Sequence, residues 1–157
     1  FWEQNPLQAL TRPQWEALCD RCGRCCLEKL TDRKTGRVFY TSVPCRLLDI
    51  HRGTCRQYEQ RRLVVPACQE LTAARVVKCR WLPSSCAYRR LVEGRALAAW
   101  HPLVCGDPDS VHRAGISVRN YPLQSITRNG VDLADYIVDW GIWDDGGGPH
   151  KRSPPIT

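Results

Sequence analysis

The sequence predicts an α+β fold: a small single domain of short helices with a small β-hairpin or sheet. Two observations predict this class. Helix-start signals recur at 11–14, at Thr72 and at the serines before Cys86, and one β-branched and aromatic run lies at 37–43. A length of 157 residues suits one domain with a modest core, and the sequence shows no internal repeat and no second domain boundary.

The N-terminal part predicts an arm followed by a helix. Residues 1–10 are apolar and aromatic around a proline, and we expect them to pack on the body of the domain. The stretch 11–14, TRPQ, is a capping box: the threonine and glutamine side chains reach each other's backbone amides, and the proline suits a first turn. We therefore predict a short helix through Leu18 that delivers Cys19 at its end.

A hairpin or short sheet is predicted in the next part of the chain. Residues 31–36 are polar and turn-like, and the run at 37–43 ends at Pro44. Cys55 and Cys68 each follow a glycine or a proline within two residues. We expect both thiols to lie on loops rather than on strand faces.

Later elements are shorter and end in a tail. Helices are predicted over 71–77 and over 84–92, the second capped by one of its two serines and followed by a stop glycine. Residues 116–119 alternate as in a strand, and 131–138 have helical apolar spacing. Because 144–157 are rich in glycine and proline, we expect a flexible or partner-docked tail there. The expected parts are therefore an arm (1–10), a cysteine-cluster metal-binding domain (11–143) and this tail.

The chain is basic, with a formal charge of +7 that comes mostly from arginine. Such a surface could dock on RNA, on an anionic protein or on a membrane surface, but the charges are scattered, so a solvated basic surface is the simpler interpretation. No run approaches the roughly 20 apolar residues of a membrane span, and we expect a soluble protein. Since the sequence contains no methionine, we expect that residue 1 is not a retained initiator. Removal of a targeting presequence and a start inside a longer chain are both open explanations.

Ten cysteines are the most informative feature of the sequence, because four of them lie within 19–26, CDRCGRCC. The Cys-x2-Cys-x2-Cys spacing lets three thiolates converge on one metal, with Gly23 in the turn. Cys26 is adjacent to Cys25, so it suits a second centre or a disulfide. A disulfide-stapled secreted protein is the alternative, but the close spacing and the size of the chain favour metal ligation.

The cysteine run continues into a longer pattern. Residues 18–30 read LCDRCGRCCLEKL. Further stretches follow in order: VPCRLL (43–48), CRQYEQR (55–61), PAC (66–68), WLPSSCAYR (81–89), WHPL (100–103) and ISVR (116–119). Together they resemble the YkgJ family, which carries the CxxCxxCC zinc- or iron-chelating domain, and within it the YcgN-like branch of bacterial proteins. The resemblance covers residues 12 to 120 and implies a bacterial cytoplasmic protein; an organellar matrix after removal of a presequence is the alternative.

The resemblance also implies a ligand set. Its cysteine pattern falls on eight positions: Cys19, Cys22, Cys25, Cys26, Cys45, Cys55, Cys68 and Cys86. Cys79 and Cys105 lie outside this pattern and are interpreted as ordinary buried thiols, with a late disulfide or an accessory ligand as the alternative. Eight thiolates make two four-coordinate centres. Tetrahedral zinc explains the count, and an iron–sulfur cluster, [4Fe-4S] being slightly favoured, explains the Cys-x2-Cys-x2-Cys run equally well.

No catalytic constellation stands out. The sequence has no nucleophile elbow, no Gly-rich phosphate loop and no paired His-Glu metalloprotease motif. His101 is interpreted as a packing histidine, and His51 is an alternative ligand in a mixed site. A centre filled by thiolates leaves no open position for water, which argues against hydrolytic chemistry and against an enzyme.

Two functions remain after these exclusions. The first is a metal-binding cysteine-cluster protein with a structural or interaction role, a subunit of a larger assembly such as a ribonucleoprotein. A protein partner is expected for it, with RNA as a further partner. The alternative is a redox-active iron–sulfur protein that transfers electrons or supports an enzyme.

Overall fold

Short helices and short strands alternate along the chain. The computed structural model describes residues 1–119, 121–125 and 129–138. Its elements are η1 (Leu7–Ala9), α1 (Arg12–Ala17), η2 (Arg24–Cys26), β1 (Leu27–Thr31), β2 (Val38–Pro44), β3 (Leu48–Asp49), β4 (Thr54–Cys55), η3 (Tyr58–Gln60), α2 (Arg61–Val64), α3 (Ala73–Val76), α4 (Ala87–Val92), α5 (Pro102–Cys105), α6 (Ser110–Arg113) and η4 (Leu133–Tyr136), where η marks a 3-10 helix. The α+β prediction is confirmed. The predicted tail at 144–157 lies outside the described residues, and the three-part division of the chain stays a prediction.

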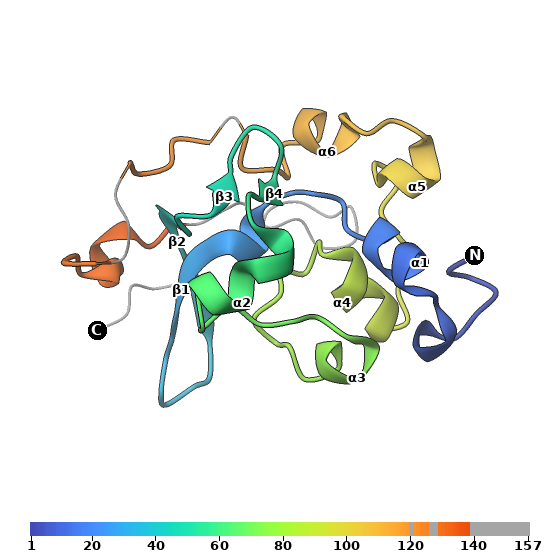
Figure 1. Ribbon diagram of the computed structural model, residues 1–157, viewed down its shortest axis with the longest axis horizontal. Helices are drawn as coiled ribbons and strands as arrows, with labels where there is room; N and C mark the ends of the chain where they lie inside the picture. The colour runs from blue at the N-terminus through green and yellow to red at the C-terminus, as the bar shows by residue number, and fades with distance from the viewer. Residues whose placement is uncertain (120, 126–128, 139–157) are drawn as a thin grey trace.

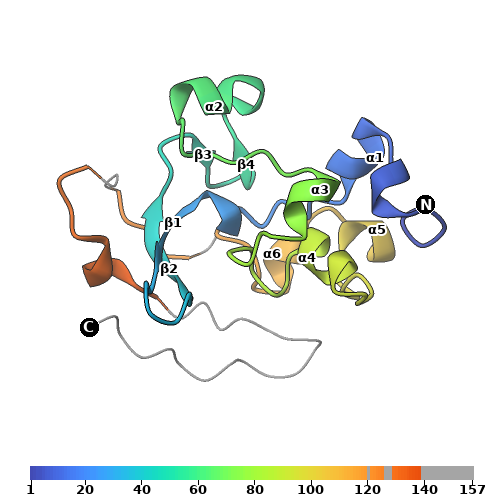
Figure 2. The same ribbon diagram turned by 90° about the horizontal axis from the view of Figure 1, so that it is seen from below.

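The elements divide between two ends of the molecule. In both views the β1–β2 hairpin and η4 lie at one end, and α1 and α5 lie at the other, with α4 between them (Figure 1, Figure 2). In Figure 2, helix α2 lies above β3, β4 and the β1–β2 hairpin. The chain crosses between these two ends just after α1, and the crossing segment is the cysteine run.

Helix α1 forms as the sequence predicts. The Thr11 hydroxyl accepts a hydrogen bond from the Gln14 amide, and the Gln14 side chain accepts one from the Thr11 amide at 3.0 Å, which completes the capping box. The helix ends at Ala17, and Leu18, its C-cap, is fully buried. Cys19 therefore starts the loop directly after a fixed helix end.

The predicted hairpin is also confirmed. Strand β1 pairs antiparallel with β2, and a bulge separates the Leu27 and Lys29 pairs. The Asp32 carboxylate holds the turn by accepting from the Lys34 amide at 2.7 Å, and Gly36 takes a positive φ of 72°. Because β1 begins immediately after Cys26, the hairpin fixes the far end of the cysteine run.

The other elements correct several predictions. Cys55 belongs to strand β4, which pairs with β3 through Leu48, so the prediction that its thiol lies on a loop is wrong. Residues 116–119 form bends and a turn rather than a strand, because three consecutive residues are buried there and alternation has no solvent face to follow. The helix predicted over 131–138 is the shorter 3-10 helix η4.

The helix predicted over 84–92 begins later than expected. Its N-cap is Cys86, and neither preceding serine provides a side-chain cap. The helix predicted over 71–77 is capped by Thr72, whose hydroxyl accepts from the Arg75 amide at 3.3 Å, as the sequence indicates. Its hydrogen-bonded core is α3, and it is shorter than the prediction.

Three apolar clusters make up the core of the described part of the chain, and the cysteine run contributes a residue to each of them. Leu18 belongs to the cluster between α1, α3 and α4, together with Val76, Cys79, Leu82 and Tyr88. Cys22 belongs to the second, with Val111 and Ile116. Leu27 belongs to the third, on the hairpin, with Tyr40, Leu48 and Val118. The ten residues from Leu18 to Leu27 thus join three separately packed parts of the molecule.

Candidate metal centres

The cysteine run is held by backbone turns that its own sequence provides. The Asp20 carboxylate accepts a hydrogen bond from the Cys22 amide at 2.9 Å, and the Arg21 amide donates to the Cys19 sulfur at 3.4 Å. Arg21 has a positive φ of 61° and Gly23 one of 78°, so the chain turns twice within the run. These turns bring the side chains of cysteines three to six positions apart back toward one region.

Two glycines allow other segments to approach the run. A Cβ on Gly53 would stand 1.9 Å from the Arg21 carbonyl oxygen, so the turn that precedes Cys55 lies directly against the run. A Cβ on Gly23 would stand 2.8 Å from a methyl group of Val118. Both glycines have positive φ, and both contacts need a residue without a side chain.

Four thiols interact electrostatically around Cys25, and we call them the helical set: Cys19, Cys22, Cys25 and Cys86. Burial, then the Asp20 and Cys25 charges, raise the pKa of both Cys19 and Cys22. Burial and Asp20 raise the pKa of Cys86 to about 12, although backbone amides at the start of α4 lower it in part. Cys86 comes from a distant part of the sequence but packs on the same apolar cluster as Leu18.

A second group of four thiols gathers on the hairpin side, and we call it the hairpin set: Cys26, Cys45, Cys55 and Cys68. The Cys45 amide donates to the Cys26 carbonyl at 2.7 Å, which places the ends of β1 and β2 together. Burial raises the pKa of Cys68, with further contributions from Cys45 and Cys55. Arg46, the residue after Cys45, donates a hydrogen bond to the Val64 carbonyl at 2.8 Å, which connects the segment before Cys68 to the Cys45 segment.

The two sets meet at the adjacent pair Cys25 and Cys26. A hydrogen bond from the Cys26 thiol lowers the pKa of Cys25 to about 7, and the same hydrogen bond raises the pKa of Cys26. Lys29 lowers the pKa of Cys25 further, and its ammonium group donates to the Cys25 and Leu27 carbonyls at 2.8 and 2.6 Å. A thiolate at Cys25 is thereby stabilised at the point where the two sets join.

The donor set fits a thiophilic metal by its chemistry, because soft thiolates select zinc and iron–sulfur clusters. The geometry is open: in the described part of the chain, no three His, Cys, Asp or Glu side chains come close enough to hold a metal ion as they stand. The members of each set therefore lie within electrostatic range and must close to bonding distance to ligate. Because burial raises the pKa of Cys19, Cys22 and Cys86, an incoming metal must also displace their protons.

The remaining cysteines and two histidines stand apart from the sets. Cys79 is buried in the α1–α3–α4 cluster, where its thiol donates to the Arg75 carbonyl at 3.3 Å, whereas Cys105 is exposed, so the prediction that both are buried holds only for Cys79. His101 is buried, and its two ring nitrogens bond the Leu18 carbonyl at 2.9 Å and the Leu103 amide at 3.1 Å. It therefore has the packing role that the sequence predicts. His51 is exposed.

Sequence reasoning missed the charged residues of the run. Asp20 is 5% exposed, and within the described residues its Oδ2 atom has no hydrogen-bond partner. Arg24 is 1% exposed, and its Nε donates to the Ile116 carbonyl at 2.6 Å. The only available signal was the position of both charges between cysteines, which would suit a solvated loop equally well. A buried carboxylate next to the helical set repels added thiolate charge, and Arg24 and Lys29 offset it.

Comparison with known proteins places both sets inside one family region. Residues 18–87 match the CxxCxxCC family model, described as "Putative zinc- or iron-chelating domain". The match begins at Leu18, ends at the first residue of α4 and includes all eight thiols, but not Cys105. No solved structure matches the chain.

Curated relatives extend the likeness to nearly the whole chain. A UPF0260 protein of Rhizorhabdus wittichii is 50% identical over 139 residues, which cover 88% of this chain and 94% of that protein. A UPF0260 protein of Gluconacetobacter diazotrophicus is 49% identical over 156 residues, covering 99% and 94%. One of Marinobacter nauticus is 47% identical over 140 residues, covering 89% and 95%. The chain therefore belongs to the UPF0260 family.

Proposed function

We propose that each set of four thiols ligates one metal centre and that the protein is a metal-dependent structural or interaction module. The observation that carries this proposal is the position of the cysteine run, which joins three apolar clusters and contributes thiols to both sets. Metal–thiolate bonds at this junction would fix all three clusters relative to one another. Ligation energy is then folding energy, as in other small cysteine-rich modules.

Zinc and an iron–sulfur cluster are the two candidates for these centres. Tetrahedral zinc with four thiolates accounts for both sets in the same way. A [4Fe-4S] cluster suits the helical set in particular, because Cys19, Cys22 and Cys25 come from one short run and Cys86 comes from far away in the sequence. We propose that the helical set binds a [4Fe-4S] cluster. For the hairpin set, zinc and a cluster are both candidates.

The test is the metal content and the visible spectrum of protein purified without oxygen. A brown protein with iron and sulfide, bleached by dithionite, supports the cluster at the helical set. A colourless protein with two zinc ions per chain supports two structural zinc centres. A protein that contains neither metal and melts cooperatively at the same temperature with and without a chelator would refute metal ligation altogether.

A redox function is the second candidate, and the charges around Cys25 favour it. Arg24 and Lys29 lie near the helical set, and the Arg21 amide donates to the Cys19 sulfur. Charges and hydrogen bonds to the sulfurs tune the reduction potential of a cluster. Reversible reduction of the purified protein without loss of iron supports electron transfer, whereas loss of the cluster on reduction limits it to a structural role.

The proposal includes a protein partner, and the α2 region is where the chain supports one. Leu63 is 84% exposed and stands between Arg62 and Val64.

No helix in the described ranges is both long enough and apolar enough to cross a membrane. We propose a bacterial cytoplasmic protein of the YcgN-like branch that is a subunit of a larger assembly, with a ribonucleoprotein as one candidate. Co-purification of nucleic acid with the native protein, measured by its absorbance ratio, tests that last point.

A further inference from the structure

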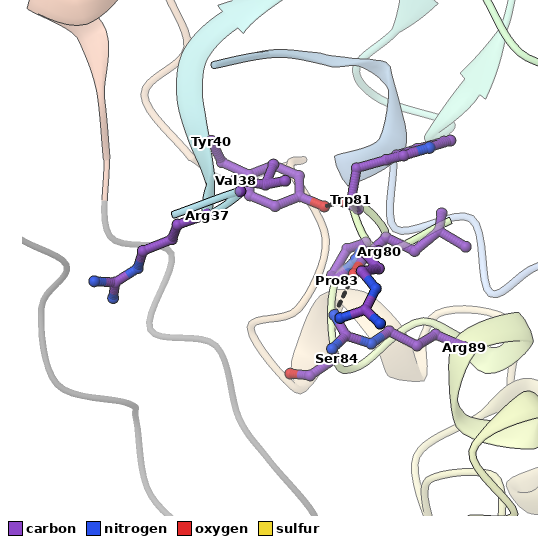
Figure 3. A pocket seen from close by; sticks show the side chains of 10 residues that line it. Arg37, Val38, Tyr40, Arg80, Trp81, Pro83, Ser84 and Arg89 are labelled. Atoms are coloured by element: carbon purple, nitrogen blue, oxygen red, sulfur yellow. Dashed lines mark hydrogen bonds between the residues drawn. The ribbon is translucent and has the colours of Figure 1, made fainter. Parts of the chain in front are cut away.

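A pocket of about 310 Å³ lies between the hairpin turn and the segment 80–84 (Figure 3). Val38 and Tyr40 of β2 line one side, and Trp81 and Arg80 line the other. Such a volume is at the lower end for pockets that bind small organic molecules. The pocket can therefore take one compact ligand, and its lining determines the chemistry of that ligand.

Three arginines line the pocket, and two of them approach each other. Arg80 and Arg89 both line it, and their side chains extend toward each other beside Ser84, while Arg37 extends away from them (Figure 3). Arg89 is held in place, because it donates to the Leu82 carbonyl at 2.7 Å and pairs with Glu93 at 2.8 Å. The guanidinium of Arg80, by contrast, makes no hydrogen bond or ion pair with any described residue. Two guanidinium groups in one pocket with a single carboxylate partner favour a bound anion.

The third polar group is the hydroxyl of Ser84. Its oxygen is buried, and within the described residues it has no hydrogen-bond partner. A buried hydroxyl without a partner costs free energy, which an accepting ligand atom would recover. A phosphate group can pair with both arginines, because it accepts several hydrogen bonds and binds a guanidinium in a bidentate manner, and a rotation of the Ser84 side chain would add its hydroxyl.

Apart from Gly36 and Arg37 of the hairpin turn, the rest of the lining is apolar or aromatic: Val38, Tyr40, Trp81, Leu82 and Pro83. The Lys29 ammonium group lies over the Tyr40 and Trp81 rings, 5.2 and 5.1 Å from their centroids. These cation–π contacts help to hold both rings in place. An apolar wall next to an anion site suits a flat ring joined to a phosphate. We propose that this pocket binds one nucleotide unit, with its phosphate on Arg80, Arg89 and Ser84 and its base against the apolar wall. None of the eight thiols lines the pocket.

Isothermal titration calorimetry on the purified, metal-containing protein tests this proposal. The probes are adenosine monophosphate, adenosine, inorganic phosphate and a short oligoadenylate. We expect the monophosphate or the oligonucleotide to bind, inorganic phosphate to bind more weakly, and adenosine not to bind measurably. Binding of the monophosphate identifies a free nucleotide as a sufficient ligand, and binding of the oligonucleotide alone identifies single-stranded nucleic acid as the source. Absence of binding by both, or equal binding of adenosine and its monophosphate, would overturn the proposal.

Matched variants locate the site. Arg80→Gln removes an exposed charge inside the pocket and should weaken binding about tenfold or more, since a charge-assisted hydrogen bond is lost. Arg33→Gln removes an exposed charge of the hairpin turn outside the pocket and should leave the affinity unchanged. Ser84→Ala should weaken binding a few-fold. Equal affinities for the Arg80 and Arg33 variants would place the ligand elsewhere and overturn the assignment, and the melting temperatures of the variants confirm that each is folded.

Discussion

The helical set and the hairpin set each contain four cysteine sulfurs, but the chain assembles the two sets differently. Three thiols of the helical set come from one turn-rich run, and only Cys86 is brought from a distance. The hairpin set takes its thiols from four separate segments. All four of its cysteines are partly exposed, whereas the helical set ranges from the buried Cys22 to the exposed Cys19 and Cys25. The first set is therefore placed by local backbone turns, and the second by the packing of loops that are far apart in the sequence.

This difference predicts different consequences of metal binding. Closing the helical set fixes a run that already joins three apolar clusters, so its metal stabilises the whole domain. Closing the hairpin set ties the Cys55 and Cys68 segments to the ends of β1 and β2, so its metal orders a surface region. Substitutions that damage one set and spare the other can break or sharpen this contrast.

The largest effect is expected for Cys22→Ser. Cys22 is buried at the junction of the clusters, so the variant should lose the metal of the helical set and destabilise the fold by on the order of 5 kcal/mol. Metal analysis and thermal unfolding measure the two losses together. An unchanged melting temperature with full metal content would show that Cys22 is not a ligand.

A smaller effect is expected where the backbone approaches the run. Gly53→Ala would force a Cβ to 1.9 Å from the Arg21 carbonyl oxygen at a positive φ, and we expect a loss of about 3–5 kcal/mol. Gly36→Ala is the matched control, because Gly36 has a similar φ of 72° but no atom within 4 Å, and it should lose only about 1–2 kcal/mol. Chemical denaturation of both variants measures the difference. Equal losses would mean that the approach of the Cys55 turn to the run contributes nothing beyond backbone strain.

Cys68→Ser should affect the hairpin set alone. We expect the variant to keep the metal of the helical set, to lose that of the hairpin set and to melt with a loss of about 1–2 kcal/mol, because the tie that is lost joins surface segments. Limited proteolysis should show faster cleavage between α2 and α3. Loss of both metals in this variant would mean that the two sets form one cooperative unit, which would end the contrast between them.

The sequence predicts the local half of this site well and the long-range half poorly. The capping box at Thr11, the end of the first helix before Cys19 and the hairpin after Cys26 are all local signals, and all three are confirmed. The grouping of Cys86 with the run, and of Cys68 with Cys45, depends on packing between distant segments, which no local pattern encodes.

The burial of charged residues is the second feature that the sequence does not predict. Nothing in residue type or spacing distinguishes Asp20 and Arg24 from a solvated pair, although both are nearly inaccessible in the structure. The failed strand at 116–119 has the same origin. Its residues alternate between apolar and polar, but Ile116, Ser117 and Val118 are all buried. They pack against the cysteine run, where the Ile116 carbonyl accepts a hydrogen bond from Arg24. Tertiary contacts with the cysteine run thus override the local pattern at these positions.

The smallest effect is expected for Cys105→Ser. Cys105 is exposed at the end of α5, belongs to neither set and lies outside the family match at 18–87. Its thiol makes only weak contacts, 3.5 Å to the Trp100 carbonyl oxygen and 3.8 Å to that of Asp107. Metal content should stay the same, and stability should change by less than about 0.5 kcal/mol, as for other surface substitutions. If this variant lost metal, a thiol outside both sets would take part in ligation, and the division of eight thiols into two closed groups of four would have to be abandoned.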